Sequence, residues 1–145
     1  MKALLQRVSR ASVAVNADCI GKIDQGLLVL VGLVNGDDRA VADRMLDKLL
    51  AYRVFADAEG HMNYSVADVN GGVLLVSQFT LSADTRKGLR PSFSSAMPPV
   101  EAEPLYDYLL SQLQSRHAPV AWGVFGADMQ VSLANEGPVT FLLEV

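Results

Sequence analysis

Residues 26–33 read GLLVLVGL, and this unbroken apolar run decides the fold. A strand that faces solvent on one side alternates apolar with polar residues, whereas a strand covered on both faces is apolar throughout. A second run of this kind occupies Val73–Gln78. The chain is therefore predicted to contain two strands that are buried on both faces.

Shorter strands are predicted around these two runs by alternating apolar residues and by turn residues. A Ser-Arg turn separates the first two of them, and the polar residues 58–72 and 82–100 are predicted to be loops, the second long enough to serve a function. The shorter strands are Ala3–Val8, Ser12–Val15, Ile20–Ile23, Val54-Phe55, Val120–Val124, Met129–Leu133 and Thr140–Val145.

Two helices are predicted from apolar residues that recur at helical spacing. The first follows the turn and N-cap residues Asn35–Asp38 and ends near Tyr52, and the second covers Glu101–Arg116. With about eight strands against two helices, we expect an α+β fold, namely a mostly antiparallel, barrel-like β core with the helices packed against it. We expect residues 1–145 to form a single domain.

The amino-acid composition limits the classes of function that we expect for this protein. Only 19% of the residues are charged and the net charge is −4, which gives no general electrostatic reason to expect nucleic acid. One cysteine, Cys19, excludes an internal disulfide and a cysteine zinc cluster, and we interpret it as an inert core or strand thiol. We read no targeting or membrane segment and expect a cytoplasmic protein. A local basic cluster is formed by Arg86, Lys87 and Arg90.

The familiar catalytic motifs are missing. Neither a glycine-rich nucleotide loop nor the spacing of a zinc site occurs, so we expect no metal and no cofactor. His117 is interpreted as favouring the helix dipole, and His61 lies in a polar loop without a nucleophile elbow. Ser77 and Thr80 end a buried strand, but the sequence offers no base beside either hydroxyl.

Four stretches together resemble the D-aminoacyl-tRNA deacylase family, also called D-tyrosyl-tRNA(Tyr) deacylases, over essentially the whole chain. The stretches are QRVSRASVAV at 6–15, SQFTL at 77–81, KGLRPSF at 87–93 and NEGPVTF at 135–141. The resemblance implies a homodimer with active sites at the subunit interface. It also implies hydrolysis of the ester between a D-amino acid, or glycine, and the 3′-terminal adenosine of tRNA, with rejection of L-aminoacyl substrates.

The resemblance assigns catalysis to Ser77, Gln78, Phe79 and Thr80. The amides of Phe79 and Thr80, with the Gln78 side chain, would stabilise the oxyanion of ester hydrolysis. The Phe79 ring would stack on the terminal adenine. The alternative is that Phe79 belongs to the core and that the two hydroxyls merely satisfy the end of the strand.

Chiral selection would fall to Asn135, Gly137 and Pro138. The resemblance implies that the Gly137–Pro138 bond is cis and enters the partner subunit's active site, where its carbonyls hold the α-amino group and exclude an L side chain. An ordinary turn is the alternative. Phe125 and Met129 either wall the pocket or belong to the core.

The basic cluster Arg86, Lys87 and Arg90 would bind phosphates of the tRNA end, unless it is an ordinary solvated loop. The resemblance also implies that the 2′-hydroxyl of the terminal ribose orients or activates the attacking water, which would explain why no histidine or carboxylate is placed next to SQFTL. Two other functions stay open from the sequence: a conventional esterase with Thr80 as nucleophile, and a dimer that binds the tRNA end without catalysis.

Overall fold

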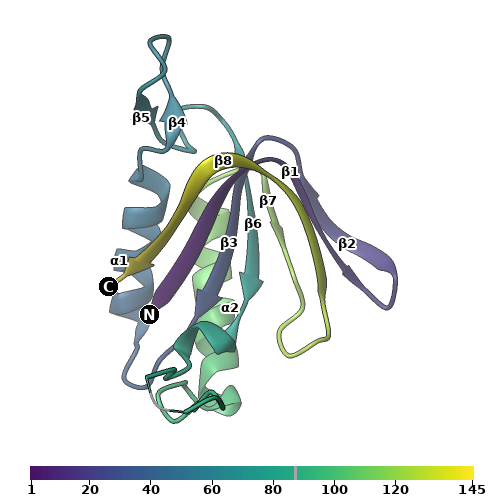
Figure 1. Cartoon of the computed structure of the whole chain (residues 1–145), viewed down its shortest axis with the longest axis vertical. Helices are drawn as coiled ribbons and strands as arrows, with labels where there is room; N and C mark the ends of the chain where they lie inside the picture. Colours follow the sequence, from purple (N-terminus) through teal and green to yellow (C-terminus); the bar gives the residue numbers. More distant parts are fainter. Residues whose placement is uncertain (87) are drawn as a thin grey trace.

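The computed structural model describes every residue of the chain except Lys87. Neither helix in this described part is long and apolar enough to cross a membrane. The elements follow the order β1 (Lys2–Val15), β2 (Asp18–Ile23), β3 (Gly26–Gly32), α1 (Arg39–Ala51), β4 (Phe55–Ala56), β5 (Met62–Tyr64), β6 (Gly72–Ser77), the 3₁₀ helix η1 (Phe79–Ser82), α2 (Pro99–Arg116), β7 (Val120–Trp122) and β8 (Gln130–Glu144) (Figure 1).

The main sheet has the strand order β2-β1-β3-β6-β7, and β8 pairs with β1. All pairings of β1 are antiparallel, whereas β3 pairs with β6, and β6 with β7, in parallel. Parallel neighbours need a crossover connection, which α1 and α2 supply. The expected α+β fold, a barrel-like and mostly antiparallel core with two helices, is confirmed.

The predictions of short strands at both ends of the chain were wrong. The residues 2–15 form one continuous strand, and its pairing with β8 shifts register between Gln6 and Val8 and again between Val8 and Arg10. Such bulges bend a strand without ending it, so the Ser-Arg pair lies inside β1. The strand β8 is likewise continuous and arches over the sheet in Figure 1 instead of breaking at residues 135–138.

The other differences concern boundaries. Part of the predicted loop 58–72 forms strand β5, which pairs with β4 in a small separate hairpin. Helix α1 begins after Asp38 as predicted, since this side chain accepts a hydrogen bond from Val41 N at 2.8 Å. Helix α2 begins at Pro99, slightly before the predicted start, because proline suits the first turn of a helix.

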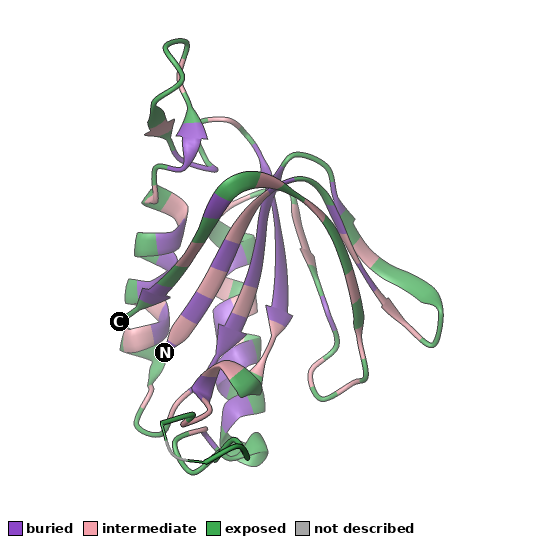
Figure 2. Cartoon of the chain, in the orientation of Figure 1, coloured by how far each residue is buried: buried purple, intermediate pink, exposed green. Residues whose placement is uncertain are grey.

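The prediction that both apolar runs are buried on both faces is confirmed (Figure 2). Alternate residues of β3 and β6 face two separate cores. Leu27 and Leu75 pack in the core that includes the residues buried from both helices, and Leu28 and Leu74 pack in a second core between the strands. The two central strands are therefore fixed on both sides, and they form a rigid base for the segments that follow them.

Candidate functional site

A pocket with a volume of about 390 Å³ lies where β3 and β6 end. It is enclosed by η1, the start of α2 and the loop between β7 and β8. The described residues that line it are Val31, Leu33, Val76, Ser77, Gln78, Phe79, Met97, Pro99, Ala102, Phe125, Gly126, Ala127, Asp128, Met129 and Val131. Five residues predicted to belong to the site therefore line one cavity: Ser77, Gln78, Phe79, Phe125 and Met129.

The turn from β6 into η1 is held tightly against β3. The backbone N–H of Gln78 donates to the Val31 carbonyl at 2.7 Å and ends the strand pairing. A Cβ atom at Gly32 would lie 2.9 Å from the Gln78 carbonyl, so this close approach requires glycine. The buried Ser82 hydroxyl donates to the Leu33 carbonyl at 3.0 Å. The helix η1 is thus fixed at both of its ends.

The first turn of η1 leaves donors free. Within the described part of the chain, the backbone N–H groups of Phe79 and Thr80 form no hydrogen bond. This is expected, because the first amides of a helix have no acceptor inside it. The Gln78 side chain donates from Nε2 to the Thr80 Oγ1 at 2.6 Å. Among the described residues, no histidine or carboxylate hydrogen-bonds to the hydroxyl of Ser77 or Thr80.

Phe79 does not belong to the core. Its side chain is 59% exposed, and its ring packs against the ring of Phe93 with centroids 5.0 Å apart and planes inclined by 56°. The alternative of a core Phe79 is therefore wrong. The sequence analysis did not predict this contact of Phe93 with Phe79, although Phe93 lies in the motif KGLRPSF. The two rings present an exposed aromatic surface beside the pocket.

Phe125 and Met129 are half-buried and form part of the pocket wall. The Phe125 ring packs against Tyr106 at a centroid distance of 5.7 Å. Tyr106 is itself fixed, since its hydroxyl donates to the Leu75 carbonyl at 3.2 Å. Burial raises the pKa of Tyr106 well above its ordinary value, so this hydroxyl stays a donor. The wall is thereby anchored to the central strand.

The basic cluster is only partly free to meet an anion. Arg86 donates from Nε and Nη2 to the two oxygens of Asp84 at 2.9 and 2.7 Å. These hydrogen bonds hold the pKa of Asp84 well below its usual range, so the carboxylate stays charged and compensates the guanidinium. Arg90 is exposed. The predicted contact Lys87 lies outside the described residues.

Asn135, Gly137 and Pro138 lie elsewhere on the sheet, in the bend of β8. The Asn135 side chain donates from Nδ2 to the carbonyls of Arg7 at 2.9 Å and Val139 at 3.0 Å, so it braces the residues between. The Gly137–Pro138 bond is cis, and so is Ala118–Pro119. Arg7 also contacts this bend, with its Nε 3.6 Å from the Glu136 carboxylate, a contact that the sequence did not reveal.

One chain does not bring the two motifs together. Arg7, next to the bend of β8, pairs with Leu27, which pairs with Val73 at the start of β6. The pocket begins at the far end of β6, and four residues of extended strand from Val73 to Ser77 span about 13 Å. Among the residues that the structure describes, Gly137 and Pro138 do not line the pocket of their own chain.

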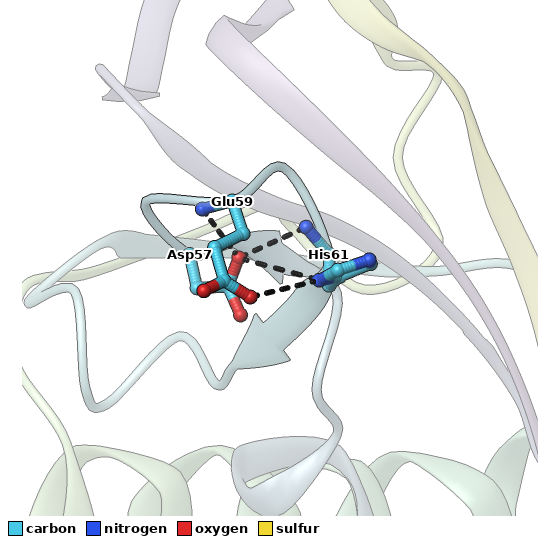
Figure 3. Close-up of side chains that lie close together, drawn as sticks. All are labelled: Asp57, Glu59 and His61. Atoms are coloured by element: carbon cyan, nitrogen blue, oxygen red, sulfur yellow. Dashed lines mark hydrogen bonds and ion pairs between the residues drawn. The ribbon is translucent and has the colours of Figure 1, made fainter.

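Both histidines have contacts away from the pocket. His61 lies with Asp57 and Glu59 in the β4–β5 hairpin (Figure 3), 3.6 Å from Glu59 and 4.0 Å from Asp57. Asp57 Oδ1 accepts the amides of Glu59 and His61, which closes this turn. His117 Nε2 lies 2.7 Å from the Gly71 carbonyl. The backbone N–H of His117 donates to the Leu113 carbonyl at the C-terminal end of α2. Cys19 is in a strand, as predicted, but it is exposed and not in the core.

Comparisons with known proteins agree with these motifs. The family model for D-Tyr-tRNA(Tyr) deacylase matches residues 4–144. The D-aminoacyl-tRNA deacylase of Cellvibrio japonicus is 62% identical over 100% of this chain and 99% of its own length. That of Pseudomonas fluorescens is 64% identical over 99% of both chains.

Two solved structures share the fold. The c-Myc DNA Unwinding Element Binding Protein is 44% identical, with a TM-score of 0.95 over 100% of this chain and 99% of the other. A probable eukaryotic D-amino acid tRNA deacylase is 17% identical, with a TM-score of 0.84 over 99% and 98% of the two chains, which shows the fold alone. By the family match over nearly its full length and by these relatives, the chain belongs to the D-Tyr-tRNA(Tyr) deacylase family.

Proposed function

We propose that this protein hydrolyses the ester bond of D-aminoacyl-tRNA, and of mischarged glycyl-tRNA, and releases the free amino acid and tRNA. One observation carries the proposal: beside the pocket, the backbone amides of Phe79 and Thr80 form no hydrogen bond among the described residues, and no described histidine or carboxylate hydrogen-bonds to the hydroxyl of Ser77 or Thr80. Such a site suits the stabilisation of an oxyanion better than the activation of a side-chain nucleophile. Membership in a family of tRNA deacylases supplies the substrate class.

In the proposed mechanism, the amides of Phe79 and Thr80 donate to the ester carbonyl oxygen as it becomes an oxyanion. Fixed donors of this kind contribute on the order of 10²–10³ in rate each. Water attacks the ester, and the 2′-hydroxyl of the terminal ribose orients or activates it. The contact of Thr80 Oγ1 with the Gln78 amide disfavours Thr80 as nucleophile, because an amide group cannot remove a proton.

Chiral selection is proposed to depend on a second subunit. Asn135, Gly137 and Pro138 would enter the partner's pocket, where backbone carbonyls hold the α-amino group and leave no room for an L side chain. Three observations support a homodimer. The bend of β8 is remote from the pocket of its own chain, and β8 carries the exposed residues Leu133 and Leu142. In the described part of the chain, no strand pairs with the outer edge of β8.

The terminal adenosine is proposed to bind in the pocket, with the Phe79 ring stacked on the base. Its apolar lining, including Phe125 and Met129, suits the flat face of a purine. The proposed role of Arg86, Lys87 and Arg90 is to contact phosphates of the tRNA end as they leave the pocket. Of these, Arg86 must exchange its contact with Asp84 for a phosphate.

Deacylation of D-tyrosyl-tRNA, glycyl-tRNA and L-tyrosyl-tRNA by the purified protein tests the proposal. We expect turnover of the first two and none of the third. Equal turnover of the D and L substrates would contradict chiral selection, and a lack of turnover on all three would leave only a protein that binds the tRNA end. Undiminished cleavage of a substrate with a 2′-deoxy terminus would exclude the role of the 2′-hydroxyl.

A further inference from the structure

The pocket has one ionisable side chain on its wall. Among the fifteen described residues that line it, Asp128 alone carries an ionisable group. Asp128 is exposed and, within the described part of the chain, forms no ion pair or side-chain hydrogen bond. In contrast, Asp84 forms an ion pair with Arg86, and Asp57 accepts a hydrogen bond from the backbone amide of His61. Its carboxylate is therefore available to a ligand.

The position of Asp128 is well defined by its neighbours. It lies between Phe125, which packs on Tyr106, and the start of β8 at Gln130. The amide of Ala127 donates to the Val124 carbonyl at 3.3 Å and closes the turn just before it. The apolar wall residue Met129 follows directly. A carboxylate is thus held at the border of an apolar surface.

A purine bound in such a pocket needs an acceptor for its amino group. Adenine offers one hydrogen-bond donor, the exocyclic amino group at position 6. Burying this group without a new hydrogen-bond acceptor costs free energy, because its hydrogen bonds to water are lost. A carboxylate is an acceptor only. The other polar side chains of the wall, Ser77 and Gln78, lie at the strand end next to the proposed ester site, and Gln78 already donates to Thr80.

We propose that the Asp128 carboxylate accepts a hydrogen bond from the 6-amino group of the terminal adenine and so makes the enzyme specific for this base. The inference rests on the proposed function, because it requires the terminal adenosine in this pocket. It adds a determinant of base specificity to a site whose other proposed contacts recognise the ester, the α-carbon and the flat face of the base.

The kinetic test compares D-tyrosyl-tRNA that ends in adenosine with the same tRNA that ends in purine riboside, which lacks the 6-amino group. We expect the wild-type kcat/KM to favour adenosine about tenfold or more, because a hydrogen bond to a charged acceptor is lost. Asp128→Ala should cleave both substrates at equal rates, whatever its overall activity. The exposed Asp18→Ala, remote from the lining, should keep the wild-type ratio.

A terminal inosine sharpens the test, because its 6-oxo group accepts where adenine donates. Asp128→Asn can donate to that oxygen, so its preference should shift toward inosine relative to the wild type. Discrimination between adenosine and purine riboside that is the same in the wild type and in Asp128→Ala would overturn the inference. A second result would also overturn the inference: Asp128→Ala, unlike the wild type, no longer discriminates between D-tyrosyl-tRNA and its analogue without the α-amino group. The carboxylate would then bind the α-ammonium group of the substrate and not the adenine.

A binding experiment separates this inference from the proposed function. The affinity of the protein for adenosine 5′-monophosphate and for the purine riboside monophosphate is measured without any ester. We expect the wild type to prefer the adenine nucleotide and Asp128→Ala to lose that preference, even if deacylation proves absent. An equal affinity of the wild type for both nucleotides would overturn the role of Asp128 and leave the hydrolytic proposal standing.

Discussion

The region at each end of β6 supplies a different part of the proposed active site. At its C-terminal end the chain builds a partly open pocket beside the amides of Phe79 and Thr80, which form no hydrogen bond among the described residues. In the proposed mechanism, recognition of the α-carbon needs a further element from the partner subunit. Near its other end, the bend of β8 is braced by Asn135, and Gly137 and Pro138 are not among the described residues that line this pocket. We propose that each of the two regions supplies only part of an active site. The comparison favours an active site assembled from the pocket of one subunit and the bend of another.

The largest effect is expected from Gly137→Ala. A Cβ atom at this position would meet only the Asn135 Oδ1, at an ordinary 3.6 Å, among the described atoms of its own chain. The melting temperature should therefore stay close to that of the wild type. Hydrolysis of D-tyrosyl-tRNA should fall about 100-fold, because a displaced contact in the partner's site misplaces the substrate. Unchanged activity would mean that the bend has no role in the site.

A smaller loss is expected from Phe79→Ala, which tests the pocket end. Removing the stacking surface should raise KM about 30-fold, which corresponds to about 2 kcal/mol of base stacking. Stability should hardly change, since Phe79 is 59% exposed. Phe93→Ala is the matched control: it removes the neighbouring ring and should have a weaker effect. Equal effects of the two variants would indicate that the base contacts both rings.

The variant Thr80→Val tests whether Thr80 acts through its backbone amide, as a donor to the oxyanion, or through its hydroxyl, as a nucleophile. The variant keeps the backbone N–H and loses the hydroxyl that accepts from Gln78 Nε2. We expect the rate to fall only about fivefold, because one hydrogen bond contributes about 1 kcal/mol. Single-turnover kinetics with D-tyrosyl-tRNA measure this rate. A complete loss in Thr80→Val, with activity kept in Thr80→Ser and an ester trapped on the residue, would favour the nucleophile instead.

The smallest effects are expected from the basic cluster, in the dependence of tRNA binding on salt. Arg90→Gln should flatten the slope of log affinity against log salt by about 0.7, the value for one phosphate contact to a single strand. Arg86→Gln should flatten it less, because Asp84 already compensates this guanidinium. Slopes that match the wild type in both variants would show that the cluster is only solvated surface.

Local sequence patterns predicted much of this molecule. The runs at 26–33 and 73–78 indicated strands buried on both faces, and periodicity located both helices, since burial leaves its mark in adjacent residues. The continuity of β1 and β8 could not be predicted, because bulges at Gln6–Arg10 depend on pairing with a strand that is distant in sequence.

The predictions of site residues also succeeded where the signal is local in the sequence and failed where it depends on tertiary contacts. The motif SQFTL identified the strand end that forms part of the pocket, whereas the contact of Phe93 with Phe79 and the place of Asp128 on the pocket wall depend on tertiary packing. No local pattern predicts that an aromatic residue in a polar loop contacts Phe79, or that an aspartate in a turn lines the pocket. The contact of Arg7 with the bend of β8 escaped prediction for the same reason.

Subunit complementation tests the shared site most directly. Gly137→Ala carries the defect in the bend, and Phe79→Ala carries it in the pocket, so at substrate concentrations below KM each homodimer should be nearly inactive. After subunit exchange at equal concentrations, half of the dimers are mixed, and each mixed dimer has one site with both parts intact. The account predicts recovery of about a quarter of the wild-type deacylation rate. Activity that stays at the level of the separate variants, with exchange verified, would contradict it.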